Sequence, residues 1–167
     1  MEIRLAQAED TAGVAEVHIS ARNSYYDGHV DVAALDRRAA QLRAFYTEAP
    51  ERFDRRLWCA ELDGEVVGMA LTGPSQDIVG PWVGQLYQIH VHPDHWRKSI
   101  GTALHTTCLD AWRAAGITVG VLEVWSRNER AQAFYESHGW RPDGHTRPGP
   151  RDDTGATTYL RLRRTIT

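Results

Sequence analysis

The sequence predicts an α+β protein with a single mixed, mostly antiparallel sheet and helices on both of its faces. Two observations favour this class. Asp63-Gly64 joins two apolar, strand-like segments, which is the strongest signal for a β-hairpin in the chain. A segment with helical spacing, Ser99–Ala115, separates the strand-like runs Gly84–His92 and Thr118–Val124, which predicts a right-handed crossover between parallel strands. The length of 167 residues predicts one domain, residues 1–167, around one core.

The first half of the chain is expected to form a short strand, Glu2–Leu5, followed by two helices. Apolar residues recur at helical spacing through Glu9–Arg22 and again from Val32 to about Tyr46. Asp31 can cap the second helix, because its carboxylate can accept a bond from a free amide, and Ala49-Pro50 ends that helix. A three-stranded antiparallel meander follows, with a loop at Gly73–Val83 before its last strand: Arg56–Leu62, Glu65–Thr72 and Gly84–His92.

The second half of the chain continues the alternation of helix and strand. In Ser99–Ala115 the small and apolar residues step by three and four, so they share one helix face, and Gly116 is a natural stop. The β-branched segment Thr118–Val124 reads as a buried strand. Asn128 begins a helix that ends near Ser137, and two final strands flank a Gly/Pro/Asp-rich loop: Trp140–Thr146 and Thr157–Arg163.

Composition and charge exclude several classes of partner. The formal net charge of −3 gives no support to nucleic-acid binding, which favours a strongly basic face. No apolar run approaches the length of a membrane span, and the first residues lack the apolar core of a signal peptide. Cys59 and Cys108 fall on apolar positions, so we interpret them as reduced core thiols and expect a cytoplasmic protein.

The most informative segment is the loop Trp96–Thr102, which joins a buried strand to the start of a helix. A helix N-terminus offers free backbone N–H groups and the positive end of the helix dipole, and Gly101 lets a ligand approach the backbone closely. Arg97 and Lys98 add positive charge. This combination is typical of a phosphate-binding loop, although such a short motif also occurs by chance as an ordinary turn.

Two signatures, in order and at the right separation, resemble the GNAT superfamily of acyl-CoA-dependent N-acyltransferases. The first is a strand ending in Val91-His92-Pro93 and then the loop Trp96–Gly101, which matches Gln/Arg-x-x-Gly-x-Gly/Ala in part. The second lies downstream: Leu122-Glu123-Val124, Asn128, Ala131, Phe134-Tyr135 and Gly139-Trp140. The Ile3-Arg4 opening and Val66-Val67-Gly68 also resemble the family, so the likeness spans nearly the whole chain.

The resemblance implies a sheet in which the parallel strand pair splays to admit acetyl-CoA, with a β-bulge near Val91. It implies a binding site for the cofactor's backbone-like arm and phosphates at Ile89, His90, Val91, Arg97, Lys98, Ser99, Ile100, Gly101, Thr102, Asn128 and Tyr135. It further implies that Tyr135 protonates the departing thiolate, because a phenol carries a proton at neutral pH. Read without the resemblance, Asn128 is a helix cap and Tyr135 is a core aromatic.

Two loop positions depart from the family pattern. Trp96 stands where Gln or Arg is usual, and Ser99 stands where the first Gly is usual, so Ser99 either crowds the phosphates or donates to one. The general base also stays open, because Gln85, Tyr87 and Gln88 replace the Glu that many relatives carry on this strand. The remaining candidates are a water relay or one of four side chains: His90, Glu123, His138 and Tyr159.

The implied function is direct transfer of an acetyl group from acetyl-CoA to a primary amine of a small molecule or peptide, without a metal, nucleic acid or membrane. Many members of the family form homodimers, and the sequence is compatible with one. We expect the acceptor pocket between Glu9–Glu48, the Gly73–Val83 loop and the Thr146–Thr157 loop. Its candidate lining residues are Tyr25, Tyr26, Trp82 and Trp125, which can instead be packing aromatics. Asp27, Asp31 and Asp77 can attract a cationic amine, but we favour reading them as solvated surface carboxylates.

Two alternatives from other classes remain. His90-x-His92-x-Asp94-His95 matches the H-x-H-x-D-H zinc signature of metallo-β-lactamase-like hydrolases, in which zinc activates water. That fold needs a longer chain and further downstream ligands, for which only His105, His138 and His145 are available. The third class is a module that binds acyl-CoA without catalysis, which an intact Tyr135 speaks against.

Overall fold

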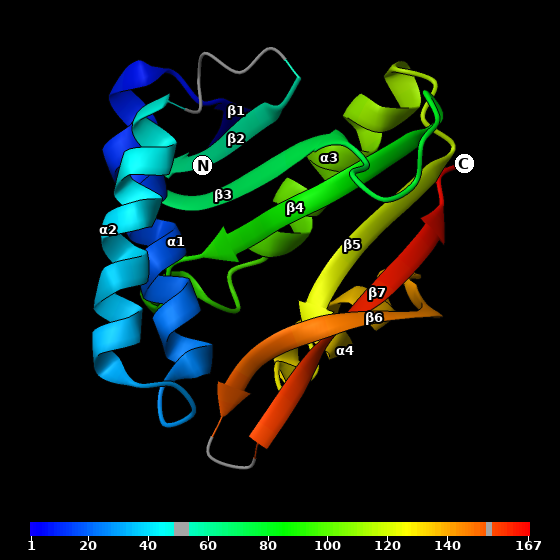
Figure 1. Cartoon of the computed structure of the whole chain (residues 1–167). Coiled ribbons are helices and arrows are strands. Elements are labelled where there is room, and N and C mark those ends of the chain that lie inside the picture. Colours follow the sequence, from blue (N-terminus) through cyan, green and yellow to red (C-terminus); the bar gives the residue numbers. More distant parts are fainter. Residues whose placement is uncertain (49–53, 153–154) are drawn as a thin grey trace.

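A computed structural model describes residues 1–48, 54–152 and 155–167 (Figure 1). In this part of the chain, seven strands form one sheet in the order β1-β2-β3-β4-β5-β7-β6. Its only parallel neighbours are β4 and β5. The strands are β1 (Glu2–Leu5), β2 (Arg56–Leu62), β3 (Glu65–Pro74), β4 (Val83–Val91), β5 (Val119–Trp125), β6 (Arg141–Asp152) and β7 (Gly155–Thr165). The predicted α+β class is confirmed.

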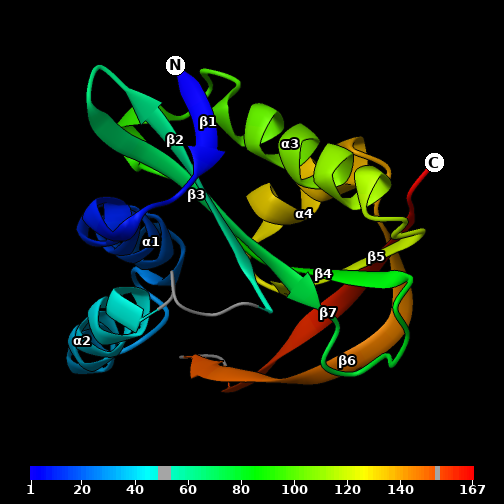
Figure 2. The same ribbon diagram turned by 90° about the horizontal axis from the view of Figure 1, so that it is seen from above.

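The helices cover both faces of the sheet, as Figure 2 shows: α1 and α2 lie on one side, and α3 and α4 lie on the other. Their bounds are α1 (Thr11–Tyr26), α2 (Val32–Glu48), α3 (Ile100–Ala114) and α4 (Glu129–Ser137), with 3-10 turns at Ala8–Asp10 and Pro93–His95. The Asp31 carboxylate accepts a bond from the amide of Ala34 at 3.3 Å, which confirms the predicted cap of α2. The predicted stop at Ala49-Pro50 lies outside the described residues. No helix described here is long and apolar enough to cross a membrane.

Two element ends differ from the sequence prediction. Helix α1 continues four residues past Arg22, because Tyr26 at its end is buried against Trp125. Strands β6 and β7 are longer than predicted, because register shifts in their pairing, between Pro142 and Thr146 and between Pro148 and Arg151, accommodate Gly and Pro within an extended ladder. For α1 a contact with a distant segment overrides the local signal, and for β6 and β7 the pairing within their own hairpin does so.

Cys59 and Cys108 are free and buried on opposite faces of the sheet, as the sequence predicts. Burial raises the pKa of the Cys108 thiol to about 12, so it stays protonated and acts as a small apolar side chain. The Cys59 thiol contacts the Asp10 carboxylate at 3.8 Å, and burial raises its pKa to about 11. Neither thiol is a nucleophile at neutral pH.

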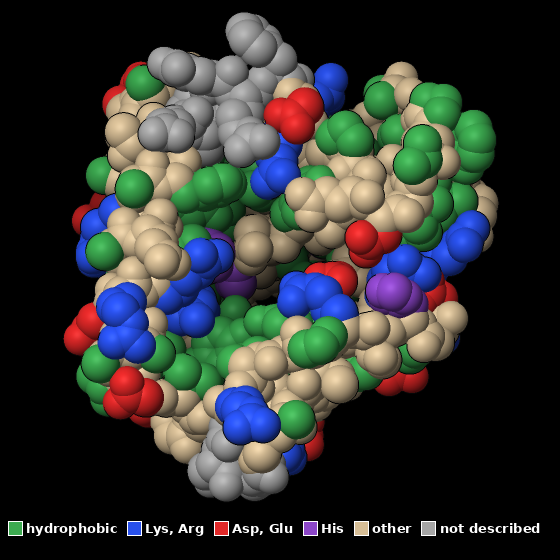
Figure 3. All heavy atoms as spheres, in the orientation of Figure 1, with side chains coloured by type: hydrophobic (Ala, Val, Ile, Leu, Met, Phe, Trp, Pro, Cys, Tyr) green, Lys and Arg blue, Asp and Glu red, His purple; other side chains and the backbone are tan. Residues whose placement is uncertain are grey.

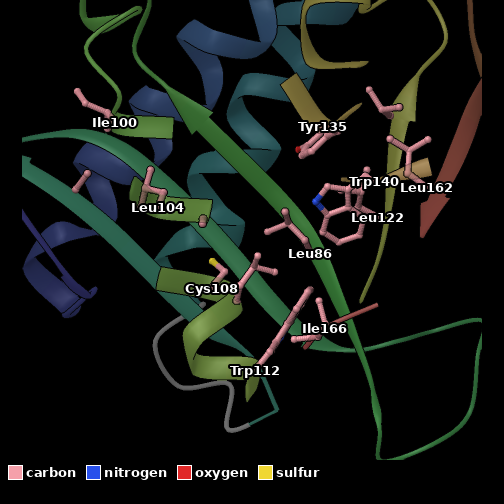
Figure 4. Packing of buried hydrophobic residues seen from close by; sticks show 14 of the residues in the cluster. Leu86, Ile100, Leu104, Cys108, Trp112, Leu122, Tyr135, Trp140, Leu162 and Ile166 are labelled. Atoms are coloured by element: carbon pink, nitrogen blue, oxygen red, sulfur yellow. The ribbon is translucent and has the colours of Figure 1, made fainter. Parts of the chain in front are cut away.

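The parallel strands β4 and β5 are paired at one end, where each contributes a glycine. Gly84 and Gly120 are register partners, and Trp112 of α3 lies over both of them. A β-carbon on Gly84 or Gly120 would fall 2.7 Å from the Trp112 ring, so only glycine permits this packing. Figure 4 shows Trp112 with Ile166, Leu86 and the rest of the buried cluster between α3 and the sheet. This packing fixes the closed end of the strand pair.

The other end of the pair is open. Parallel pairing runs from Val83 and Val119 only as far as Leu86 and Leu122, and β4 then leaves β5. At this point Thr72 pairs with Leu86 while Leu71 pairs with Gln88, so Tyr87 is an extra residue on β4. The expected bulge near Val91 was therefore misplaced: Val91 pairs regularly with Gly68, and the bulge lies at Tyr87 because that is where the two strands separate.

Candidate active site

A cavity of about 920 Å³ occupies the gap between the separating strands and extends toward α1 and α2. Figure 3 shows its opening as a hollow in the middle of one face, with Lys and Arg side chains around it and His side chains within it. Its walls come from α1, α2, β4, β5, β6, β7, α4 and the start of α3. Except for Lys98, every residue predicted for the cofactor site lines this cavity: Ile89, His90, Val91, Arg97, Ser99, Ile100, Gly101, Thr102, Asn128 and Tyr135.

The loop before α3 presents backbone amides because of an unusual conformation. Ser99 is the residue before the first turn of α3, and its backbone is left-handed, with φ 60° and ψ 10°. Arg97 is also left-handed, with φ 61°. Glycine adopts this region without steric cost, whereas an L-residue pays roughly 1–2 kcal/mol. The geometry thus explains why glycine is usual at position 99, and it shows that this chain keeps the same turn with a serine.

Trp96, the second departure from the pattern, ties the loop to its surroundings. Its indole Nε1–H donates to the carbonyl oxygen of Val91 at 2.8 Å. The guanidinium of Arg130, from α4, lies over its ring at 3.4 Å from the centroid. Trp96 therefore links the end of β4 to α4 across the gap between the strands, a contact that the sequence did not predict.

The region around the loop before α3 has space and one unpartnered polar atom for a phosphorylated ligand. A β-carbon on Gly101 would meet Phe134 and Val91 at 3.7 Å, which is ordinary van der Waals distance. The buried Nδ1 of His95, a residue that lines the cavity beside the loop, has no hydrogen-bond partner in the described part of the chain. A buried polar atom without a partner is costly, so a ligand atom there would satisfy it. These features fit the diphosphate of coenzyme A.

Tyr135 and Asn128 approach the same gap from α4. The Tyr135 side chain is 8% exposed and lines the cavity, and its hydroxyl makes no hydrogen bond within the described residues. Burial, followed by the influence of Tyr25, raises the pKa of Tyr135 above its usual range, so its hydroxyl keeps its proton at neutral pH. Asn128 Oδ1 accepts from the amide of Ala131 at 3.1 Å, which confirms its predicted role as a helix cap.

A pair of histidines lies on the cavity wall toward α1. The rings of His90, on β4, and His18, on α1, stack with centroids 4.2 Å apart. His90 Nε2 lies 2.8 Å from Gln88 Oε1. With the Gln88 amide in this orientation, Nε2 is the donor and Nδ1 keeps a lone pair, because an amide oxygen only accepts. Burial, and then the charges of Arg22 and Arg130, lower the pKa of His90 to about 3, so its ring is neutral at physiological pH.

The other candidates for the general base are occupied or distant. The Glu123 carboxylate is paired with Arg147 at 2.5 Å. The Tyr159 hydroxyl bonds to that of Tyr26 at 2.5 Å. His138 lies outside the residues that line the cavity, and its Nδ1 contacts the carbonyl oxygen of Phe134 at 2.7 Å. Among these four side chains, His90 alone lines the cavity without a charged or hydroxyl partner.

Some of the residues predicted to line the acceptor pocket do line the cavity. Tyr25, Tyr26 and Trp125 line the cavity, where Tyr26 packs on Trp125 with centroids 4.6 Å apart. Trp82 does not line it and is 53% exposed, because it sits at the far, closed end of β4. Asp27, Asp31 and Asp77 are exposed and lie outside the cavity lining, which agrees with the favoured reading of them as solvated surface carboxylates.

The zinc signature does not assemble. No group of three or more His, Cys, Asp or Glu side chains suited to a metal occurs in residues 1–48, 54–152 and 155–167. His90 stacks on His18, whereas His92 Nδ1 lies 3.7 Å from Asp94, and His105 is a core residue that accepts from the Trp140 indole at 2.9 Å. His90 is thus held in the strand against His18, whereas His92, Asp94 and His95 lie together in the turn that follows.

Comparison with known proteins gives the family. A profile described as "Acetyltransferase (GNAT) family" matches residues 20–140, well over half of the chain. The chain belongs to the GNAT acetyltransferase family. Members of this family are acyltransferases, and the zinc-hydrolase alternative is therefore set aside.

Relatives and structural neighbours of this GNAT protein agree with this family assignment. It is 28% identical over 149 residues to a Mycobacterium tuberculosis protein named as a probable N-acetyltransferase, covering 87% of this chain and 83% of that one. It is 28% identical over 144 residues to the Escherichia coli L-amino acid N-acyltransferase, covering 84% and 79%. The PaiA N-acetyltransferase of Thermoplasma acidophilum, solved with coenzyme A, superposes with a TM-score of 0.78 over 98% of both chains at 18% identity, which shows the shared fold.

The sequence did not point to two groups of cavity residues. One comprises His18, Arg22 and Arg38, which α1 and α2 bring to the cavity from the first quarter of the chain. The other comprises Arg130 and Arg147, from α4 and β6. No spacing rule links these positions, and each of the four arginines taken alone reads as an ordinary solvated cation.

Proposed function

We propose that this protein transfers an acetyl group from acetyl-CoA to a primary amine of a small molecule or peptide in a single direct step. The observation that carries the proposal is the continuous cavity that joins the amide-rich start of α3 to Tyr135 and then to the α1–α2 side. Family membership supports the acyltransfer chemistry, and the neighbour solved with coenzyme A supports the cofactor class. Two free, buried thiols support the cytoplasm as its location.

Acetyl-CoA, when bound, supplies the thioester whose carbonyl carbon the amine attacks. The residues of this chain that would hold it are the amides of the Arg97–Thr102 loop for the phosphates, with Arg97 and His95 beside them. Backbone groups of Ile89–Val91 are proposed to align the arm in the gap left by the bulge at Tyr87 and to polarise the carbonyl. The tie between Trp96 and Val91 would fix this wall before a ligand enters.

Two cavity residues are proposed to move the protons of the reaction, one toward the leaving sulfur and one away from the amine. Tyr135 holds a proton at its hydroxyl, and we assign it as the acid that protonates the leaving sulfur. The attacking amine must lose a proton, and we assign His90 as the first acceptor because its Nδ1 lone pair lies on a cavity-lining ring. A neutral ring with a low pKa is a weak base, so the proton would pass onward to water rather than stay on His90.

A two-part experiment tests the function. Purified protein is titrated with acetyl-CoA by calorimetry, and thiol release is then followed with a panel of primary amines at saturating acetyl-CoA. Binding together with amine-dependent release of one thiol per acetylated amine is expected. Tight binding without release for any amine would instead indicate a non-catalytic acyl-CoA-binding module, and absence of binding would refute the cofactor assignment.

A further inference from the structure

The charge on the cavity wall is opposite to that of the whole protein. Although the chain carries a formal net charge of −3, the cavity is lined by five arginines and one carboxylate in the described part of the chain. That carboxylate, Glu123, is already paired with Arg147 at 2.5 Å. A cavity with low-dielectric walls focuses such a field, so it attracts anions and repels a purely cationic amine.

Two of these arginines are not accounted for by the cofactor site. Arg97 belongs to the loop before α3, and Arg130 stacks on Trp96 beside that loop. Arg22 and Arg38 come instead from α1 and α2, which lie on the other face of the sheet from α3 and α4 (Figures 1 and 2). They therefore flank the side of the cavity that remains for the acceptor.

Arg22 and Arg38 are held in place, and neither has a counter-ion among the described residues. The Arg22 guanidinium lies over the Tyr26 ring at 4.5 Å, and Arg38 donates to the Gln41 side chain at 3.0 Å. Neither arginine forms an ion pair with a carboxylate of the described residues. Both arginines line the same cavity, and after burial and His90 their charges also lower the pKa of His18 on its wall.

Resting on the function proposed above, we infer that the acceptor is a primary amine that carries a carboxylate, as an α-amino acid does, and that Arg22 and Arg38 bind this carboxylate. A guanidinium matches a carboxylate in shape and charge and donates two parallel hydrogen bonds to it. Bound in this way, the carboxylate fixes the amine relative to the thioester, and proximity of this kind supplies much of the rate in acyl transfer.

Paired acceptors test the inference directly. Each of a panel of L-α-amino acids is compared with its own amide, which has the same side chain and amine but no carboxylate. The amine of the amide loses its proton more readily, so intrinsic reactivity favours the amide and a preference for the acid reports on recognition. For the best acceptor, kcat/KM is expected to be at least about tenfold higher for the acid.

Variants identify the residues responsible. Arg22→Gln and Arg38→Gln are each expected to lower the ratio of kcat/KM for the acid to kcat/KM for the amide by about tenfold or more. The ratio is the readout because the charge of Arg22 also lowers the pKa of His90, so its removal changes the turnover of both acceptors. The affinity for acetyl-CoA should be unchanged in both. Arg37→Gln is the matched control, because Arg37 is the exposed neighbour of Arg38 on α2 and does not line the cavity; it should behave as the parent protein does.

Binding to protein saturated with CoA, which cannot react, gives a second readout by calorimetry. Acid-selective binding that depends on Arg22 and Arg38, without thiol release, would support the carboxylate site and refute the acetyltransferase function. Two results would overturn the inference while the acetyltransferase function stands. The first is thiol release with equal kcat/KM for the acid and its amide. The second is that the variants lower the affinity for acetyl-CoA rather than kcat/KM for the acid. The inference is likewise overturned if no acid is preferred in either readout.

Discussion

Gly101, in the first turn of α3, allows the phosphate-binding assignment to be separated from fold stability. An alanine β-carbon there meets only ordinary contacts at 3.7 Å, from Phe134 and Val91. Replacing glycine by alanine in a helix stabilises it by up to about 1 kcal/mol, and less at a helix end. Gly101→Ala should therefore unfold at the parent temperature or slightly above it, and bind CoA with an affinity close to that of the parent protein.

Gly101→Asp has a different expected outcome, because it adds a charge at the same place. The free protein should remain stable, since a carboxylate at a helix N-terminus is favourable by roughly 0.3–1 kcal/mol. A phosphate about 5 Å from that carboxylate, in an effective dielectric constant of about 20–40, is repelled by roughly 1.7–3.3 kcal/mol. The Kd for CoA should accordingly rise by a factor of about 15–250.

Calorimetric titration with CoA, alongside thermal unfolding of the free proteins, measures both effects. The alanine variant controls for the loss of glycine, so a difference between the two variants reports on the charge alone. The effect should shrink in high salt, because added ions screen a partly exposed charge. If Gly101→Asp binds CoA as tightly as Gly101→Ala does, the phosphates do not lie at the start of α3.

Three further predictions concern other parts of the molecule. Tyr135→Phe should lower kcat by about 10²-fold or more with little change in acetyl-CoA affinity, and equal turnover would remove Tyr135 from the mechanism. Ser99→Gly should raise the free energy of unfolding by about 0.5–1 kcal/mol by relieving the left-handed strain, whereas Ser99→Ala, which keeps the strain, should not; denaturant titration of both decides. The free energy of unfolding should fall as the pH drops below about 6.5, because burial lowers the pKa of His105 to about 4 and that of His90 to about 3. Below pH 6.5 the unfolded chain therefore binds protons that the folded chain does not. Equal urea midpoints near pH 7 and pH 5 would contradict this.

Much of the fold and the cofactor end of the candidate site could be predicted, because local signals encode them. The Asp63-Gly64 turn, the cap at Asp31 and the face of α3 each depend on residues a few positions apart. The loop before α3 is also contiguous in sequence, which is why its motif is readable. The lengths of α1 and β6 were underestimated, because a contact with Trp125 extends α1 and the pairing with β7 carries β6 through its Gly and Pro positions.

The part of the cavity where β4 and β5 separate could not be predicted in the same way. The bulge at Tyr87 depends on where β4 stops pairing with β5, which in turn depends on Trp112 packing over Gly84 and Gly120. The same holds for the stack of Arg130 on Trp96, since one residue precedes α3 and the other belongs to α4. These contacts are decided by packing between distant segments, and no periodicity along the chain records them.

The sequence alone determined the class of the sheet, the order of its elements and the phosphate-loop signature, because each is set by neighbours within a helical turn or a hairpin. Only the tertiary structure decided the sign of the field in the cavity. A net charge of −3 summed along the chain conceals five arginines gathered around one hollow, since charge adds up without regard to position whereas an electrostatic field depends on distance.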